Sequence, residues 1–152
     1  MIGSLVGVNG HTFDLEYDLF FTTERIIAVI IQHPADFPRQ FTPIWKTMFF
    51  GSGWEKRKEQ RERERNAQAR RRASQNLTPD ELVTAHSGNV EIWYSEITSV
   101  EITRRFYQSQ LRFYVSMPST TGQIIRFNLS KKQIPEAQHL LDRVLLPKIK
   151  MK

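Results

Sequence analysis

The chain has no cysteine among its 152 residues, which excludes disulfide bonds and thiolate metal sites. Long apolar stretches are missing too: the longest purely apolar run, Ile26–Ile31, is far too short to span a bilayer. The first residues, Met1–Gly10, lack the basic start and long apolar core of a signal peptide. We therefore expect a cytoplasmic protein, either soluble or peripheral to the inner face of the membrane.

Recognisable catalytic patterns are missing as well. The four histidines are scattered and lack the spacing to acidic residues that metal ligands need: His11, His33, His86 and His139. No serine lies in a nucleophile-elbow sequence. The glycines around Ser52 lack the lysine of a phosphate-binding loop. We predict neither an enzyme nor a bound metal or cofactor.

Charge is concentrated in one stretch, Trp54–Arg72. It contains nine basic and four acidic residues, so it carries +5 of the formal +6 of the chain. No apolar side chain occurs from Glu55 to Arg65, and opposite charges recur four residues apart, as in Glu59 and Arg63. This pattern predicts a solvated helix that frays towards Ala67–Ala73. It is either a charged spacer or a cationic surface for the phosphates of lipid or nucleic acid.

An aromatic segment lies directly before the charged stretch. Thr42-Pro43 resembles a helix cap. Large apolar side chains then recur at helical spacing: Phe41, Ile44, Trp45, Met48 and Phe49. We predict a short amphipathic helix that ends at Gly51–Gly53. Its apolar face either packs on the body of the protein or enters a membrane interface beside the basic residues.

The sequence before this segment alternates as β-strands do. Three runs are expected to be strands: Ser4–Val8 with a tight turn at Asn9-Gly10, then Phe13–Leu19, then Arg25–Gln32. In the second run the apolar residues share one face, and three carboxylates (Asp14, Glu16 and Asp18) face solvent. The third run is apolar on both faces, which predicts a central strand.

After the charged stretch, β-structure resumes beyond one short helix. Thr78 is the expected cap of that helix, Pro79 its first residue and His86 its approximate end. Four further strands are predicted: Val90–Tyr94, Ile97–Thr103 with Glu101 outward, Leu111–Met117, and Ile125–Leu129 after a turn at Thr121-Gly122. An amphipathic helix from Ile134 to Leu146, stopped by Pro147, completes the pattern.

Seven short antiparallel strands and a C-terminal helix predict a single α+β, mainly β domain over residues 1–152, folded as a sandwich or partly open barrel. Residues 3–32 and 88–147 form its body and capping helix. Residues 41–86 form a helical, highly charged insertion between the third and fourth strands.

Three segments resemble the small prokaryotic domains of the pleckstrin-homology-like (PH-like) superfamily. Leu19–Ile27 (LFFTTERII) is similar to a strand entry of that family, Ile92–Ile102 (IWYSEITSVEI) to a turn between its strands, and Ile124–Leu129 to the strand before its C-terminal helix. The resemblance implies a curved sheet closed at one end by the helix, serving as a binding platform rather than as an enzyme. It also permits homo-oligomers. Lipid-binding members carry basic residues between their first two strands, whereas Asn9–His11 has none, so the insertion is the better candidate surface.

The leading hypothesis is a non-enzymatic PH-like module that associates with an anionic membrane surface through the insertion. The expected membrane-binding residues are Trp45, Phe49, Phe50, Trp54, Lys56, Arg57, Lys58 and Arg61, with Arg70, Arg71 and Arg72 as a second anchor. The alternative is a protein partner or self-assembly into a homo-oligomer through the same insertion. Non-specific nucleic-acid binding ranks third, because four glutamates dilute the potential and no aromatic residue from Glu55 to Arg72 is available to stack on bases.

Overall fold

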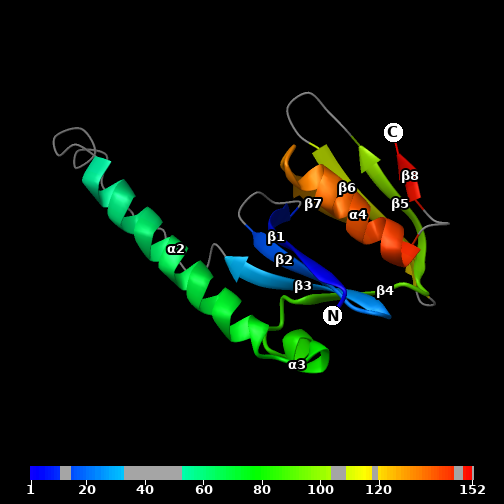
Figure 1. Ribbon diagram of the computed structural model, residues 1–152, viewed down its shortest axis with the longest axis horizontal. Coiled ribbons are helices and arrows are strands. Elements are labelled where there is room, and N and C mark those ends of the chain that lie inside the picture. Colours follow the sequence, from blue (N-terminus) through cyan, green and yellow to red (C-terminus); the bar gives the residue numbers. More distant parts are fainter. Residues whose placement is uncertain (11–14, 33–52, 104–108, 118–119, 146–148, 152) are drawn as a thin grey trace.

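The computed structural model describes residues 1–10, 15–32, 53–103, 109–117, 120–145 and 149–151; residues 53–56, 59, 116–117, 120–122 and 149–151 are described as backbone only. The described elements are β1 (Gly3–Gly10), β2 (Glu16–Phe21), β3 (Arg25–Gln32), α2 (Gly53–Gln75), α3 (Pro79–Thr84), β4 (Val90–Trp93), β5 (Ile97–Thr103), β6 (Ser109–Met117), β7 (Thr120–Leu129), α4 (Gln133–Leu145) and β8 (Ile149–Met151). Figure 1 shows α4 lying across the strands and α2 extending away from them.

The strands form one sheet in the order β4-β3-β2-β1-β7-β6-β5-β8. Seven strands are linked by antiparallel pairs, and β8 adds to β5 in parallel. The prediction of a mainly β, α+β fold is confirmed, and the sheet is open, with β4 and β8 at its edges. The eighth strand was not predicted, because three residues after Pro147 are too few to show an alternating pattern.

One face of the sheet carries the main core, which α4 covers. The helix buries five apolar residues on the side predicted from its periodicity: Ile134, Ala137, Leu140, Leu141 and Leu145. Val144, which was predicted to face the core as well, is only partly buried. They meet a cluster in which Phe127 packs edge-on against both Tyr17 and Phe113, with ring centroids 5.7 and 6.2 Å apart. Apolar burial of this kind contributes about 25 cal/mol for each Å² removed from water.

The opposite face of β2 and β3 carries a second, smaller apolar cluster. Its strand residues are Phe20, Ile27, Val29 and Ile31, and the helices cover them with Ala67 of α2 and Leu82 of α3. The prediction that Arg25–Gln32 is a central strand is confirmed, since β3 pairs with β2 on one side and β4 on the other. An apolar strand face cannot stay exposed, so the two helices are the cover that this strand requires.

Two predicted tight turns are wrong. Asn9 and Gly10 lie inside β1, where they pair with Asn128 and Phe127 of β7. Thr121 and Gly122 lie inside β7. In both places the strand continues because a neighbouring strand offers hydrogen-bond partners, and this tertiary pairing outweighs the local turn preference.

The predicted fraying of the charged helix is also wrong. Helix α2 continues to Gln75, and Ala67 and Ser74 are buried where it lies against β3. Two carboxylates that were expected to face solvent, Asp18 and Glu101, are buried as well. Glu101 accepts a hydrogen bond of 2.9 Å from the Tyr114 hydroxyl, which offsets part of the cost of removing its charge from water.

Candidate functional site

Helix α2 packs on the body of the protein over only part of its length. At 23 residues it is about 35 Å long. Its C-terminal part lies on the sheet, and its N-terminal part projects into solvent (Figure 1). Every side chain described between Arg57 and Asn66 is exposed. The helix is therefore an arm that is attached to the body at one end only.

The attachment depends on an ion-pair cluster that joins Arg71 to β2. The Arg71 guanidinium donates from Nε to Asp18 at 3.0 Å and from Nη2 to Glu16 at 2.5 Å. Asp18 also accepts the backbone N–H of Gly7 at 2.8 Å; Gly7 has a positive φ of 69°. Burial alone would lower the pKa of Arg71, but its hydrogen bonds and charge interactions with Asp18 and Glu16 raise it.

Two neighbours of Arg71 strengthen the attachment. Arg70 donates from Nη1 to the Ile31 carbonyl of β3 at 3.1 Å. Ser74 is buried one turn further along α2, and its hydroxyl donates a hydrogen bond of 2.9 Å to the Arg70 carbonyl. Together with Ala67, these residues occupy one side of α2 at three- and four-residue spacing, so this side of the helix faces the sheet.

Helix α3 fixes the other end of the insertion. Its first turn has a capping box, in which Thr78 accepts the Glu81 N–H and Glu81 accepts the Thr78 N–H. These hydrogen bonds lower the pKa of Glu81. Arg25 of β3 pairs with Asp80 of α3 and with Glu91 of β4, and it lies 4.7 Å over the Trp93 ring. The ion pairs of Arg25 thus connect α3 to β3 and β4.

The residues predicted to bind a membrane fall into four groups. Trp45, Phe49 and Phe50 lie outside the described residues, and Trp54 and Lys56 are described as helix backbone only. The exposed members are Arg57, Lys58 and Arg61 on the arm and Arg72 near its base. Arg70 and Arg71 contact the sheet.

Sequence reasoning missed the partners of α2 on the sheet. Glu16 and Asp18 alternate with apolar residues, as solvent-facing residues do, but here a basic helix covers them. A usable signal was Phe20, the next residue on that face, together with the second apolar face of β3, because both require a cover. Arg65, which is exposed on the arm, was also left out of the expected site.

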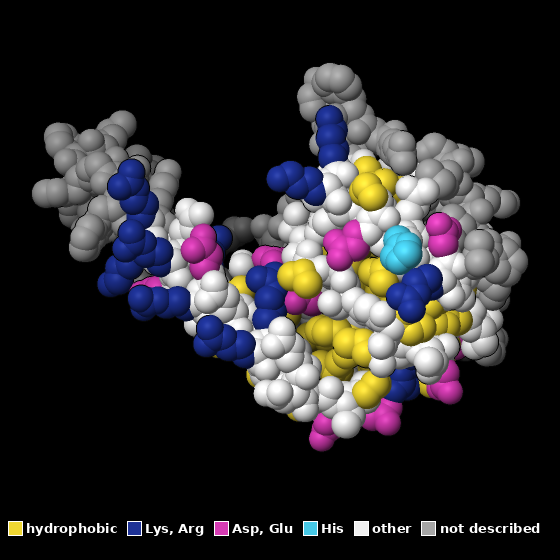
Figure 2. All heavy atoms as spheres, viewed as in Figure 1, with side chains coloured by type: hydrophobic (Ala, Val, Ile, Leu, Met, Phe, Trp, Pro, Cys, Tyr) yellow, Lys and Arg dark blue, Asp and Glu magenta, His cyan; other side chains and the backbone are white. Residues whose placement is uncertain are grey.

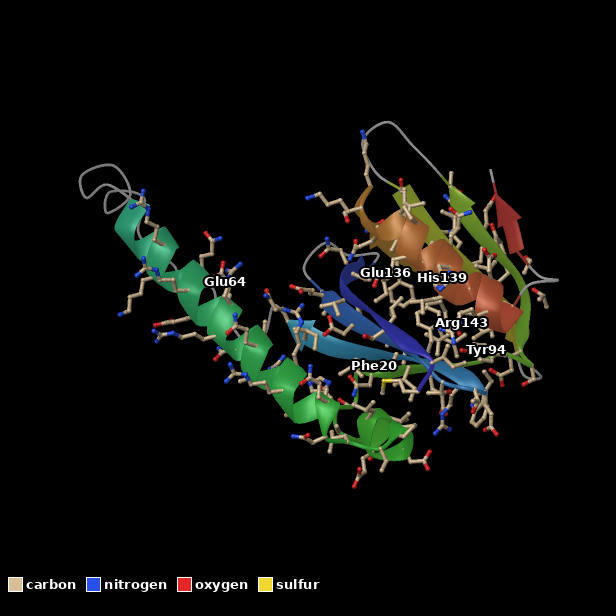
Figure 3. The ribbon with its side chains drawn as sticks, in the orientation of Figure 1. Phe20, Glu64, Tyr94, Glu136, His139 and Arg143 are labelled. Atoms are coloured by element: carbon tan, nitrogen blue, oxygen red, sulfur yellow. The ribbon has the colours of Figure 1, made fainter. Side chains whose placement is uncertain are left out.

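Most of the exposed positive charge lies on one side of the arm. Figure 2 shows Lys and Arg side chains in a row along α2, on the side away from the sheet. Figure 3 places Glu64 on the projecting part of the helix and Phe20 on the sheet. Over the described ranges there is no cluster of three or more His, Asp or Glu residues arranged to hold a metal ion. None of the described helices is long and apolar enough to cross a membrane.

Comparisons with protein-family models, with curated proteins and with solved structures gave no match to this chain.

Proposed function

We propose that this protein is a non-enzymatic binding module of PH-like type that associates with anionic membrane surfaces through its helical insertion. The observation that carries the proposal is the arm: α2 is fixed to the sheet at its C-terminal end and exposes Arg57, Lys58 and Arg61 beyond it. Each basic residue close to an anionic bilayer contributes about 1 kcal/mol. A few such residues acting together give binding that weakens as salt rises.

The order of elements supports the PH-like part of the proposal. Seven antiparallel strands are followed by a helix that packs on the sheet, and this order is what supports the PH-like type. The connection between β1 and β2, residues 11–15, has the sequence HTFDL and carries no lysine or arginine. The proposal therefore assigns binding to α2 and not to this connection.

Aromatic residues supply the second component of the proposed membrane contact. Phe49 and Phe50 precede Gly53, the first residue of α2, by four and three positions, and Trp45 lies shortly before them. They are therefore joined covalently to the projecting end of the arm. Stable peripheral binding usually needs two signals, of which a basic surface and apolar insertion are one pair.

Co-sedimentation with lipid vesicles tests the proposal. We expect the protein to bind vesicles containing phosphatidylserine and not vesicles of phosphatidylcholine alone, and to retain part of this binding at moderate salt. The double variant Trp45→Ala/Phe49→Ala should bind less at moderate salt. Ile124→Ala is the matched control, because Ile124 is an exposed apolar residue on β7, away from the insertion. Failure of the unmodified protein to bind anionic vesicles at low salt would refute the proposal.

A further inference from the structure

We infer that α2 docks lengthwise on a flat anionic membrane surface through a single basic stripe consisting of Lys58, Arg61, Arg65 and Arg72. The inference rests on the proposed function and adds the contact face, the direction of the helix and the residues that decide both.

The stripe follows from helical geometry. Its members are separated by three, four and seven residues, which are the spacings of one helix face, and it extends over about 21 Å. All four side chains are exposed. The uncharged Gln68 falls on the same line, and the spacing continues back to Trp54 in the first turn of α2. This line of helix positions thus runs from the base of the arm to the first turn of α2.

The glutamates of α2 lie off this line. With about 100° between successive residues, Glu62 falls about 70° from the centre of the stripe on one flank, and Glu64 about 90° from it on the other. Glu64 accepts a hydrogen bond from Gln60 at 3.3 Å, on the side nearer the sheet. The positions of Glu55 and Glu59 fall on the flank of Glu62, farther from the centre. The net charge of the projecting part is small, but the basic residues of the stripe are separated from the four glutamates.

This separation fits a flat surface better than a groove. A planar bilayer contacts one side of a helix, so the stripe meets the lipid phosphates while both acidic flanks stay farther away. A helix in the major groove of a duplex is enclosed on its flanks by the phosphate backbones. There Glu62 and Glu64 would be brought towards like charge, which is unfavourable. The charge pattern therefore favours an anionic membrane over a nucleic acid as the ligand.

The attachment of α2 fixes the direction in which the stripe faces. Ala67 and Ser74 are buried on the sheet, and Arg71 holds the same side of the helix to β2. Lys58 lies about 180° around the helix from Ala67, and Arg65 about 160°. The stripe is thus presented on the side away from the body, where Figure 2 shows a row of Lys and Arg side chains along α2.

A charge swap between neighbouring positions tests the stripe without changing composition or net charge. The stripe variant combines Arg61→Glu with Glu62→Arg and Arg65→Asn with Asn66→Arg. The control variant combines Arg63→Glu with Glu64→Arg, which exchanges charges on the side nearer the sheet. For the stripe variant we expect affinity for phosphatidylserine vesicles to fall by about tenfold or more. For the control variant we expect a change of less than about twofold. Circular dichroism checks that both retain their helix.

The possible outcomes separate the two proposals. If the unmodified protein binds anionic vesicles and the stripe variant binds them equally well, the stripe is refuted, whereas the proposed function stands. Equal weakening of both variants also refutes it. If the unmodified protein binds no vesicle, the proposed function itself fails. Tighter binding to duplex DNA than to vesicles at the same salt, lost in the stripe variant, would reassign the surface to nucleic acid. Should a swap disturb the helix, Arg61→Gln against Arg63→Gln repeats the test with milder changes, since both residues are exposed and each variant removes one positive charge.

Discussion

Replacing Arg71 by methionine tests the attachment of the arm most directly. Methionine keeps an apolar stem of similar length but removes the guanidinium. The side chain of Asp18 is only 3% exposed, and it accepts hydrogen bonds from Arg71 and from the Gly7 N–H. In the variant, Asp18 would keep a backbone donor but lose its cation. The substitution therefore leaves a carboxylate with uncompensated charge beneath α2.

The size of the effect follows from this burial. Breaking a buried ion pair by removing one partner costs about 3–5 kcal/mol, because the remaining charge is left without a partner. Arg71 and Glu16 are 28% and 23% exposed, so water screens part of the interaction. We therefore expect Arg71→Met to lower the free energy of unfolding by about 2–3 kcal/mol. Adding Asp18→Asn should restore about half of the loss or more, because the amide carries no charge.

Urea unfolding followed by circular dichroism measures these differences. With a typical dependence of about 1–3 kcal/mol per molar urea, the midpoint should fall by roughly 1 M for Arg71→Met. Arg72→Met is the matched control. Arg72 is the exposed neighbour of Arg71, so its replacement should change the free energy of unfolding by less than about 0.5 kcal/mol. A loss for Arg71→Met as small as that of the control would show that the pair behaves like a surface salt bridge. Additive losses in the double variant would equally contradict the reasoning.

Further predictions concern the other contacts of the fold. Leu82→Ala empties a fully buried site under α3 and should cost about 2–5 kcal/mol in urea unfolding. Thr78→Ala removes the cap of α3 and should cost about 1 kcal/mol in the same assay, with the substitution of the exposed Thr23 by alanine as a control. Gly7→Ala places a side chain at a positive φ and should cost about 1–2 kcal/mol. Burial raises the pKa of Tyr94 to about 12, and its hydroxyl donates to the Thr22 carbonyl, so the stability it supplies should be present below pH 10 and lost as the pH rises from 10 to about 12. Tyr94→Phe should remove this alkaline loss in pH-dependent unfolding, and a slope unchanged by the substitution would contradict the assignment.

The strands were the most predictable part of this fold. Arg25–Gln32 and Ile97–Thr103 have the predicted bounds, because an apolar run or a clean alternation over seven or eight residues specifies a strand by itself. Strand ends were less predictable. Gly10 continues β1 because Phe127 of β7 lies opposite it, and that neighbour is distant in the sequence.

The contact between α2 and the sheet could not be predicted from apolar periodicity. A helix usually reveals its buried face by large apolar residues, but α2 uses Ala67, Ser74 and two arginine stems. The alternation of apolar and acidic residues in β2 was equally ambiguous. A carboxylate that faces water and a carboxylate that faces an arginine on a covering helix give the same sequence pattern. Asp18 was therefore assigned to solvent, although it is one of the most buried charged groups among the described residues.

Helical phase divides the three consecutive arginines at the base of the arm between two roles. Arg70 and Arg71 were expected to join Arg72 in binding phosphate. Moving Arg71 to a lipid phosphate would gain about 1 kcal/mol at the surface. It would also leave Asp18 buried without its cation, at a cost of about 2–3 kcal/mol. Because the cost exceeds the gain, a membrane should not detach Arg71 from β2. Of the three, Arg72 alone should therefore act at the surface, and the arm keeps its attachment while it is bound.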